Sequence, residues 1–525
     1  MESKTGKVKN LSRRSFLKFF GGASLAGVSL NLAGCGQPIT AEKAVGGNGW
    51  MPTQYNEPGS WPTNVRGRVP IDPANPSIIR DDQKCILCGQ CIEVCEKIQS
   101  VFGNYELPIK SEIVCVNCGQ CIQWCPSGAI SERDDINKVL KAIADPNITV
   151  VVQTAPATRI GLGEEFGMPI GTNVQGKQVA ALRKLGFDVI FDTNFTADLT
   201  IMEEGTELVK RVKGELHHPT PQFTSCCPGW VKFVEYFYPD LIPNLSTAKS
   251  PQQMEGTLMK TYYAEKQNVD PKKIFSVAIM PCTAKKFECQ RPEMTSARKE
   301  LNDSNVTPDV DVVLTTKELA RMIKRAGIDF TSLPDDEYDQ LMGTGTGAGA
   351  IFGTTGGVME AAARSAYYLI TGQQPPASLW ELTPVRGMEG VKEATVNIPG
   401  FGSIKVAVIS GLANARKVMD QIRAGNAPWV FIEVMACPGG CQYGGGQPRA
   451  SSPPSDEVRN RRAASLYKID TNAKLRNSHD NPEIKQVYAD FLTAPMSEKA
   501  EELLHTHYIS RAEALVAKKS ERNLY

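Results

Sequence analysis

Eight of the 15 cysteines stand in two blocks whose spacing suits iron–sulfur chemistry. CILCGQCIEVC spans residues 85–95 and CVNCGQCIQWC spans 115–125, so every cysteine recurs after 30 residues. Each block has the form C-x2-C-x2-C-x3-C, in which three sulfurs face one cubane and the fourth binds the cluster of the other block. The pattern therefore predicts two [4Fe–4S] clusters, one held by Cys85, Cys88, Cys91 and Cys125 and the other by Cys95, Cys115, Cys118 and Cys121.

Residues 75–135 as a whole resemble the bacterial two-cluster ferredoxins, which implies a small α+β domain. Two adjacent clusters would pass electrons one at a time, but a relay does not by itself identify the reaction. A pair of zinc knuckles is the alternative, and the duplicated order of eight cysteines favours the clusters.

Three further motifs carry cysteines: TSCCPGW at 224–230, MPCTAKKFE at 280–288 and EVMACPGGCQYGGGQP at 433–448. Adjacent side chains diverge, so Cys226 and Cys227 are not expected to bind the same cluster, and they would make a poor disulfide. The x3 spacing of Cys437 and Cys441, with glycines around them, offers two sulfurs from one tight loop and lets the backbone approach a bulky cofactor.

The elements that must position these motifs are strands alternating with helices. Continuous apolar, β-branched runs predict strands buried on both faces, as in parallel sheets, at 148–153, 188–192, 275–280, 311–314, 404–410 and 429–435. Helices are predicted between them, for example at 176–186, 315–327 and 358–370. The expected catalytic domain is therefore of the α/β class, with two lobes around a buried cofactor cleft.

Two of the predicted strands lead directly into cysteine motifs, at MPC and at EVMAC. Because ligand sites in open α/β sheets lie beyond the carboxyl ends of the strands, Cys282, Cys437 and Cys441 should converge in one crevice. TSCCPGW can supply a fourth sulfur, and four thiolates suit another [4Fe–4S] cluster.

Together the three motifs resemble the signature motifs of the [FeFe]-hydrogenases, in the expected order, and the resemblance extends over residues 75–525. It implies an H-cluster, which is a [4Fe–4S] cube joined through one cysteine to a two-iron unit with CO, cyanide and dithiolate ligands. The resemblance assigns the cube to Cys227, Cys282, Cys437 and Cys441, with Cys441 as the bridge. It further implies that Lys285 donates a hydrogen bond to a cyanide and that Cys226 delivers protons. The same resemblance lines the pocket with Met280, Met435, Pro156 and Phe352.

A proton path is expected behind Cys226. In IMEEGTELVKR, 201–211, helical spacing places Glu204, Glu207 and Arg211 on one face. The residues alone leave open whether this is a surface ladder of salt bridges. The family resemblance favours a path through Glu204, Ser246 and Glu207 towards Arg211.

The first 34 residues are expected to be an export signal rather than part of the fold. A basic leader precedes an uncharged stretch, from Phe19 to Cys35, that is too short and glycine-rich for a membrane span. SRRSFLK at 12–18 resembles the twin-arginine signal, and LAGC at 32–35 resembles a lipoprotein box with Cys35 as the lipidated residue. An uncleaved signal anchor is the alternative. Twin-arginine export carries folded proteins, so thiolate-bound cofactors are compatible with an extracytoplasmic, lipid-anchored enzyme.

The remaining organisation follows from composition. The expected divisions are a linker at 35–74, a ferredoxin-like domain at 75–140, the catalytic domain at 145–450 and a C-terminal segment at 451–525. That segment is expected to be mostly helical and resembles the small subunit of some periplasmic [FeFe]-hydrogenases. A net charge of +1 gives no case for nucleic acid, and 5 histidines against 15 cysteines argue against a histidine-rich metal site.

The expected reaction is the interconversion of H2 with protons and electrons. Its partners would be maturation proteins and an electron carrier, whether ferredoxin, cytochrome or a membrane redox subunit, and H2 uptake is the favoured direction. One alternative is a reductive dehalogenase, which also combines a twin-arginine leader with two ferredoxin motifs but carries them near its C-terminus. The other is a non-catalytic iron–sulfur electron carrier or assembly protein of the same fold.

Overall fold

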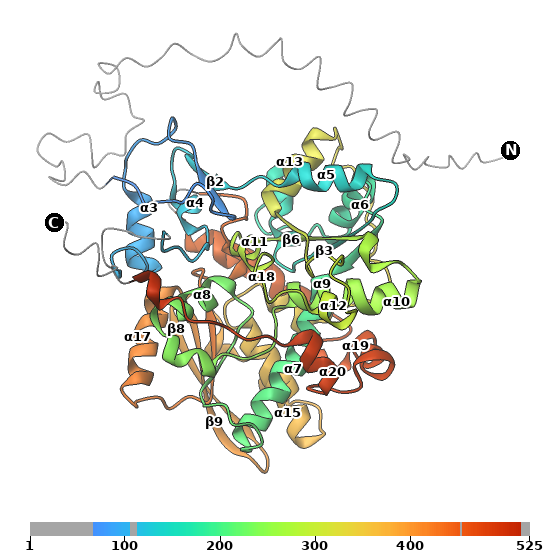
Figure 1. The fold of residues 1–525 in the computed structure, drawn as a ribbon. Helices are drawn as coiled ribbons and strands as arrows, with labels where there is room; N and C mark the ends of the chain where they lie inside the picture. Colours follow the sequence, from blue (N-terminus) through green and yellow to red (C-terminus); the bar gives the residue numbers. More distant parts are fainter. Residues whose placement is uncertain (1–66, 106–112, 452–453, 516–525) are drawn as a thin grey trace, which may run out of the picture.

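A computed structural model describes residues 67–105, 113–451 and 454–515 of the chain (Figure 1). The expected twin-arginine signal, the lipidation site at Cys35 and most of the linker at 35–74 lie outside the described residues. Within them, two four-stranded sheets form the two lobes of the predicted α/β catalytic domain.

The first lobe is built on a parallel sheet in the order β4-β3-β6-β7. Its strands are β3 (Thr149–Thr154), β4 (Val189–Asp192), β6 (Ile274–Met280) and β7 (Val312–Thr315). In β3, Val150 and Val152 pack against the core of α5 (Ile136–Ala144), α6 (Gln175–Leu185) and α13 (Thr316–Arg325). Val151 faces the opposite core, which includes α9 (Pro251–Leu258). Burial on both faces explains the continuous apolar runs and confirms the four predicted strands.

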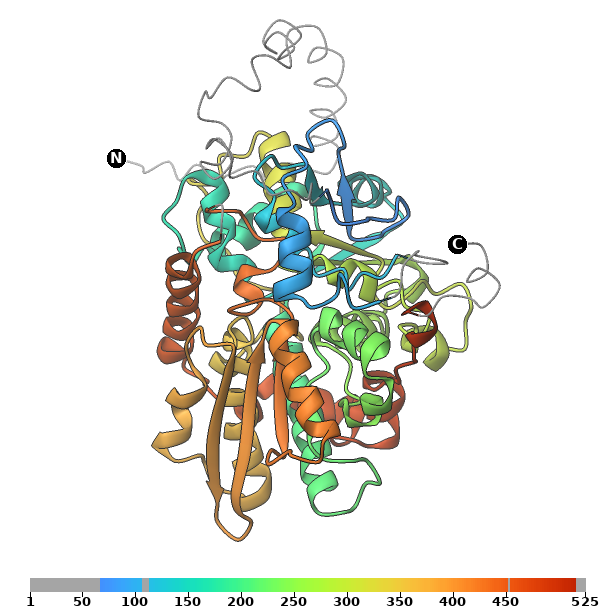
Figure 2. The same ribbon diagram turned by 90° about the vertical axis from the view of Figure 1, so that its left-hand side faces the viewer.

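The second lobe contains a mixed sheet in the order β5-β10-β9-β8. Its strands are β5 (Gln222–Phe223), β8 (Val391–Ile398), β9 (Gly402–Ser410) and β10 (Phe431–Met435). The expectation of parallel strands holds for β5, β10 and β9, whereas β8 and β9 form an antiparallel hairpin (Figure 2). β8 was missed because every second residue is exposed, so its sequence contains no continuous apolar run.

One long helix, α7 (Thr193–Val212), joins the two lobes. It starts directly after β4, where the Asp192 side chain accepts a hydrogen bond from the Asn194 backbone and caps the helix. Phe195 and Leu199 pack into the core of the first lobe, while Ile201 and Leu208 pack into that of the second. Because α7 is enclosed by both lobes, most of its polar residues are buried and must find partners inside the protein.

The cysteine repeat folds into a small unit beside the lobes (Figure 1). β1 (Ile78–Arg80) pairs antiparallel with β2 (Ile130–Glu132), and α3 (Gln90–Glu93) contacts α4 (Gln120–Trp124). Gly89 and Gly119 precede the two helices with φ values of 74° and 69°, a conformation that glycine adopts without strain. The sequence repeat is therefore also a repeat of backbone geometry.

The C-terminal segment is mostly helical, as expected, and lies along both lobes. It contains α18 (Asp456–Asn472), α19 (Pro482–Val487), a π-helical turn (Tyr488–Leu492) and α20 (Glu498–Leu504). α18 packs on α14 (Gly347–Ile351), and α20 packs on α9. Helix α20 ends at Leu504, and a non-helical stretch follows it up to Arg511.

A buried ion cluster ties this segment to α15 (Gly357–Thr371). The Arg364 guanidinium, whose side chain is 0% exposed, donates to both Asp470 carboxylate oxygens at 2.9 and 2.8 Å and to Glu360 at 2.5 Å. We expect Arg364→Met to lower the free energy of unfolding by about 3 kcal/mol, because it removes one of the two arginines that each buried carboxylate contacts. Urea unfolding of the holoprotein measures this.

Arg461→Met is the matched control for that substitution. Arg461 pairs with Glu457 on α18, and both side chains are more than half exposed. Its loss should change the free energy of unfolding by less than about 1 kcal/mol. Equal effects of the two substitutions would contradict a stabilising role for the buried cluster.

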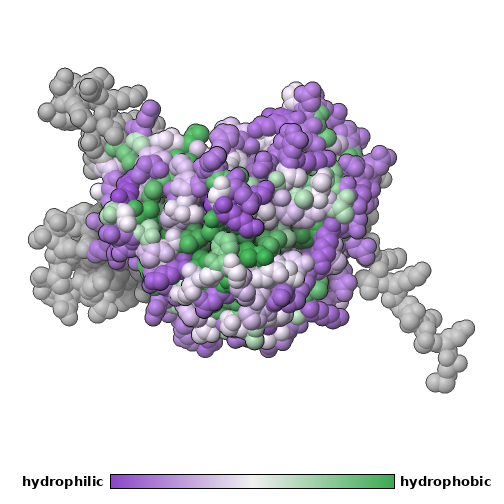
Figure 3. All heavy atoms as spheres, turned by 90° about the horizontal axis from the view of Figure 1, so that it is seen from below, coloured by the Kyte–Doolittle hydropathy of each residue, from purple (hydrophilic) through white to green (hydrophobic). Residues whose placement is uncertain are grey.

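The described surface is largely polar. Seen from below, hydrophobic atoms gather in the middle of one face and are surrounded by hydrophilic ones (Figure 3). Exposed large apolar side chains are few in the described part, and three of them, Ile79, Ile86 and Leu87, belong to the cysteine-repeat unit. Among the described helices, none has the length and apolar character needed to cross a bilayer.

Candidate active site

A single cavity receives the three cysteine motifs of the lobes. Its empty volume is about 780 Å³, and it lies where β6 and β10 end, beside the start of α8 (Pro228–Phe237). This is the carboxyl-end position at which open α/β sheets bind ligands. The residues of the three motifs that line it include five cysteines and a lysine: Cys226, Cys227, Cys282, Cys437, Cys441 and Lys285.

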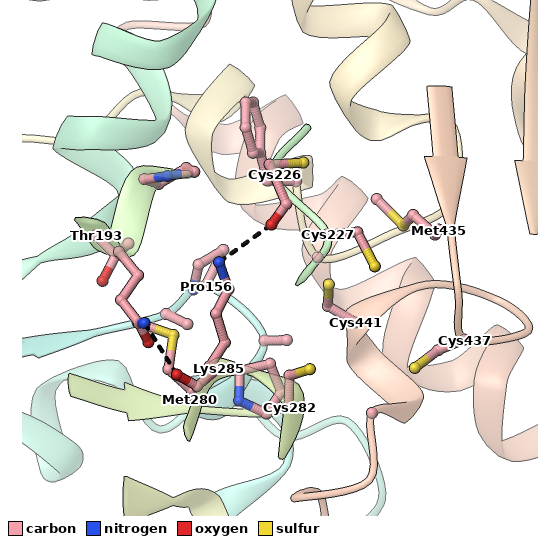
Figure 4. A pocket seen from close by; sticks show the side chains of 18 of the residues that line it. Pro156, Thr193, Cys226, Cys227, Met280, Cys282, Lys285, Met435, Cys437 and Cys441 are labelled. Atoms are coloured by element: carbon pink, nitrogen blue, oxygen red, sulfur yellow. Dashed lines mark hydrogen bonds between the residues drawn. The ribbon is translucent and has the colours of Figure 1, made fainter. Parts of the chain in front are cut away.

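Four of the sulfurs are directed towards a common space. Figure 4 shows Cys227, Cys282, Cys437 and Cys441 around it, with Cys226 pointing away. Burial, and next the nearness of the Cys227 thiol, raise the pKa of Cys282 to about 12. Burial and then Cys282 raise the pKa of Cys437. The four sulfurs are thus mutual neighbours in an apolar site, where iron can take the place of their protons.

Two glycines let the third motif approach its neighbours closely. A Cβ on Gly444 would lie 2.3 Å from the Pro281 carbonyl oxygen, and one on Gly445 would lie 2.6 Å from the Gly119 Cα. Side chains at these positions would separate the Cys441 loop from the Cys282 loop and from the cysteine-repeat unit. The glycine-rich stretch therefore brings together cysteines that are far apart in the sequence.

Lys285 lines the cavity, and its ammonium group makes two hydrogen bonds. Its ammonium donates to the Cys226 carbonyl oxygen at 3.1 Å (Figure 4). It also donates to the Glu288 carboxylate at 2.9 Å. Burial lowers the pKa of Lys285, but the Glu288 carboxylate, followed by Cys226 and Cys282, raises it, and the net shift of the pKa is upward. A permanent positive charge therefore faces a cavity whose other walls are mainly apolar, including Pro156, Met280, Phe352 and Met435.

Behind Cys226 lies Glu204, a buried carboxyl on α7. Burial raises the pKa of Cys226 well above its usual value, and the next contribution comes from the adjacent Glu204. Burial, followed by the charge of Glu207, raises the pKa of Glu204 to about 8. Neither Glu204 oxygen has a well-formed hydrogen bond to a described residue. The nearby Ser246 hydroxyl donates instead to Glu207 at 2.6 Å.

Glu207 connects this group to Arg211, and these two residues do not form a salt bridge on the surface. Glu207 accepts from the Arg211 guanidinium at 2.5 Å, and both side chains are essentially unexposed. The guanidinium also donates to the carbonyls of Pro219, Pro243, Asn244 and Leu245. The Glu207–Arg211 salt bridge is therefore buried inside the protein, and Arg211 lies beneath the loop at 213–221 instead of in bulk water.

The cysteine repeat forms two separate cages. Cys125 lines a cavity of about 320 Å³ with Cys85, Cys88 and Cys91. Cys95 lines another, of about 440 Å³, with Cys115, Cys118 and Cys121. Each fourth cysteine thus lies with the trio of the other block, as the predicted assignment requires. Among the described side chains, no three cysteine, histidine or carboxylate groups lie close enough together to hold a single metal ion.

The second cage lies nearer to the candidate active site. Burial raises the pKa of Cys118, and the neighbouring thiols that raise it further include Cys282. The Thr283 hydroxyl donates to the Asn117 carbonyl at 2.7 Å, so the residues beside the two sets of cysteines are joined. The Gln120 side chain donates to the Tyr443 carbonyl at 3.0 Å.

These contacts were not expected from the sequence. The one signal available was the glutamine of the repeated CGQC, at positions 90 and 120, of which Gln120 reaches the Tyr443 carbonyl of the third motif.

The glycine-rich stretch GTGTGAG, 343–349, serves packing in the described structure. A Cβ on Gly347 would lie 2.1 Å from an Asp470 carboxylate oxygen, and one on Gly349 would lie 2.6 Å from the Asn194 carbonyl oxygen. Glycine is required here because other elements of the chain approach the backbone closely.

Comparison with known proteins agrees with this geometry. The family model described as iron-only hydrogenase large subunit, C-terminal domain, matches residues 148–445, and the iron hydrogenase small subunit model matches 456–511. The NADP-reducing hydrogenase subunit HndD of Solidesulfovibrio fructosivorans is 47% identical over 83% of this chain and 75% of its own. The periplasmic [Fe] hydrogenase large subunit of Nitratidesulfovibrio vulgaris is 49% identical over 70% of this chain and 85% of its own.

Solved structures of [FeFe]-hydrogenases have the same fold. A variant of HydA1 from Chlamydomonas reinhardtii superimposes with a TM-score of 0.63 and 41% identity, covering 72% of this chain and 99% of that one. A more distant relative, cytosolic iron–sulfur assembly component 3 of Pongo abelii, is 33% identical over 68% of this chain and 74% of its own. The family match over most of the lobes and the close relatives together show that this chain belongs to the iron-only, or [FeFe], hydrogenase family.

Proposed function

We propose that this protein interconverts H2 with protons and electrons at an H-cluster held by Cys227, Cys282, Cys437 and Cys441. The observation that carries the proposal is the convergence of these four sulfurs around one cavity, with Cys226 and Lys285 beside them. The site fits the group chemically, because a soft, buried thiolate set suits iron–sulfur ligation and Lys285 can donate to an anionic ligand. When bound, the H-cluster supplies an open iron position at which H2 is cleaved heterolytically.

The chain itself binds, orients and transfers protons. Cys226 receives or returns a proton at its sulfur, and Glu204 exchanges it behind the cavity wall. Ser246 and Glu207 carry the path onward, and Arg211 holds the Glu207 carboxylate in place. The apolar lining excludes water from the cavity, which confines proton exchange to these side chains.

Glu204→Gln tests this path. Glutamine keeps the size of the side chain but cannot release a proton, so we expect H2 turnover to fall about 100-fold or more, measured with a viologen dye. A variant with at least half the parental rate would remove Glu204 from the path.

The same substitution should alter the pH dependence of stability. The Glu204 pKa rises from 4.5 to about 8 on folding, so the parent protein loses stability as the pH rises through this interval. In this interval the free energy of unfolding of the parent should therefore decrease, relative to that of the Gln variant, by up to about 1.4 kcal/mol per pH unit. Urea unfolding of both holoproteins at several pH values measures the difference, and parallel curves would contradict the raised pKa.

Electrons are proposed to leave through the two cages, each holding one [4Fe–4S] cluster. The cage of Cys95, Cys115, Cys118 and Cys121 neighbours the active site. The cluster in the other cage would therefore be the one that exchanges electrons with the external carrier. Ile86 and Leu87 are exposed within the outer Cys85–Cys91 loop. An apolar surface of this kind suits transient contact with an external electron carrier.

The leader supports a location outside the cytoplasm, with a lipid on Cys35 as the anchor. A relative described as periplasmic agrees with this proposal. We propose H2 uptake as the physiological direction, because oxidation on that side of the membrane releases protons there.

An infrared spectrum of anaerobically purified, maturase-loaded protein tests the proposed function. Carbonyl and cyanide bands together with H2 production from reduced viologen are expected. Cobalt in the protein would favour the reductive dehalogenase alternative. Ferredoxin-type clusters without those bands or H2 activity would favour the electron-carrier or assembly alternative. The 33% identical relative described as an assembly component is the reason to test for this alternative.

A further inference from the structure

The C-terminal segment pairs with the stretch of chain that carries Ser246. The Lys249 backbone N–H donates to the Leu504 carbonyl, and the Thr506 N–H donates to the Thr247 carbonyl, both at 2.8 Å. On its other side, the same stretch donates from the Ser246 N–H to the Phe223 carbonyl at 2.8 Å. Residues 246–249 therefore lie between the strand that leads into TSCC and the C-terminal segment.

The imidazole of His505 contacts two elements at once. Its Nε2 lies 3.1 Å from the Glu203 carboxylate, and its Nδ1 lies 2.8 Å from the Thr247 hydroxyl. Glu203 also accepts from the Tyr488 hydroxyl at 2.5 Å and from the Met496 N–H at 2.7 Å. Because a carboxylate oxygen accepts hydrogen bonds, Nε2 is the donor in the first contact, while Nδ1 makes the second contact with the Thr247 hydroxyl.

Thr247 in turn contacts Glu207. Its backbone N–H donates to both carboxylate oxygens, each at 3.2 Å. The same carboxylate accepts from the Ser246 hydroxyl and from the Arg211 guanidinium. The side-chain hydroxyl of Thr247 is therefore bound by His505 while its N–H orients Glu207.

We propose that His505 is a positioning residue for proton transfer: by fixing Thr247 it fixes Glu207 between Ser246 and Arg211. The C-terminal segment then completes the active site as well as covering the two lobes. No proton needs to pass through His505, because its link to Glu207 runs through a backbone amide. The inference rests on the proposed function, since it requires that Glu207 carry protons.

Three substitutions of His505 separate its two contacts. Asparagine places a polar atom near the position of Nδ1 and can keep the Thr247 contact, whereas glutamine reaches the position of Nε2 and can keep the Glu203 contact. Phenylalanine fills the space and keeps neither. We expect H2 turnover to fall about tenfold in His505→Phe and His505→Gln and by less than about threefold in His505→Asn. Infrared cofactor bands should be unchanged in all three.

Hydrogen exchange gives a second readout that does not depend on turnover. In holoprotein, the amide of Thr247 should exchange faster in the Phe and Gln variants than in the Asn variant and the parent. His507→Phe is the matched control, because His507 is exposed two residues further along the same stretch and should leave both measurements unchanged.

Each outcome decides the inference. Parental turnover in His505→Phe overturns it, and so do equal losses in the Asn and Gln variants, which would make His505 a packing residue only. Glu207→Gln separates this failure from that of the proposed function. If Glu207→Gln retains full turnover, the proton path itself is wrong, whereas a large loss beside an active His505→Phe rejects the positioning role alone.

Discussion

Cys226→Ala is expected to lose nearly all H2 turnover, by about 100- to 10,000-fold, while retaining the infrared bands of the cofactor. The Cys226 sulfur points away from the space that the four ligand sulfurs surround, so its removal should not disturb ligation (Figure 4). It lies between the cavity and Glu204, and alanine has no exchangeable proton to pass across that gap. Viologen assays and infrared spectra of the same preparation measure both effects.

Cys289→Ala is the matched control for this experiment. Cys289 is also buried in this region, but it does not itself line the cavity, and its thiol donates to the Lys286 carbonyl at 3.3 Å. Its removal should leave turnover within about twofold of the parent, since it costs one weak hydrogen bond. Full activity in Cys226→Ala, or loss of the bands, would refute the assigned role of the thiol.

Cys282→Ala is expected to remove the active-site cube while sparing both ferredoxin clusters. One of four thiolates is lost, and the three remaining thiols have pKa values that burial raises, so three thiols are left to exchange their protons for iron. Activity and the carbonyl and cyanide bands should be absent, and the iron content should fall to that of two clusters. Iron analysis and electron paramagnetic resonance of the reduced protein measure this.

Cys91→Ala provides the opposite pattern. Cys91 lines the outer cage and lies outside the active-site cavity, so the infrared bands should persist while one ferredoxin signal disappears. Electron transfer to an external carrier should then slow, although the active site is intact.

Parental iron content and activity in Cys282→Ala would show that this cysteine is not a ligand.

Much of the fold could be predicted because the signals are local. The six apolar runs all became strands, since a strand buried on both faces needs an unbroken apolar sequence. β8 was not predicted because one of its faces is exposed and its sequence has no continuous apolar run. The antiparallel hairpin that it forms with β9 was therefore not predicted either. The sequence therefore predicted the two lobes and most of their strands, but not the order of the strands within each sheet.

The candidate site shows the same division. The spacing of the eight repeated cysteines already implied that Cys95 and Cys125 exchange places between cages, and the structure puts them there. The burial of Arg211 could not be read from helical spacing, because the covering carbonyls come from the loop after α7 and from residues 243–245. The contact of His505 with Thr247 joins residues 258 positions apart.

The sequence by itself determined which side chains can bind iron, which runs become strands and which family the motifs resemble. These properties depend on residue type and on spacing within a few turns of chain. Tertiary structure alone decided which cage lies next to the candidate active site, how Arg211 is buried and which histidine contacts Thr247. Those features arise from packing between distant segments, and neither composition nor periodicity specifies how such segments meet.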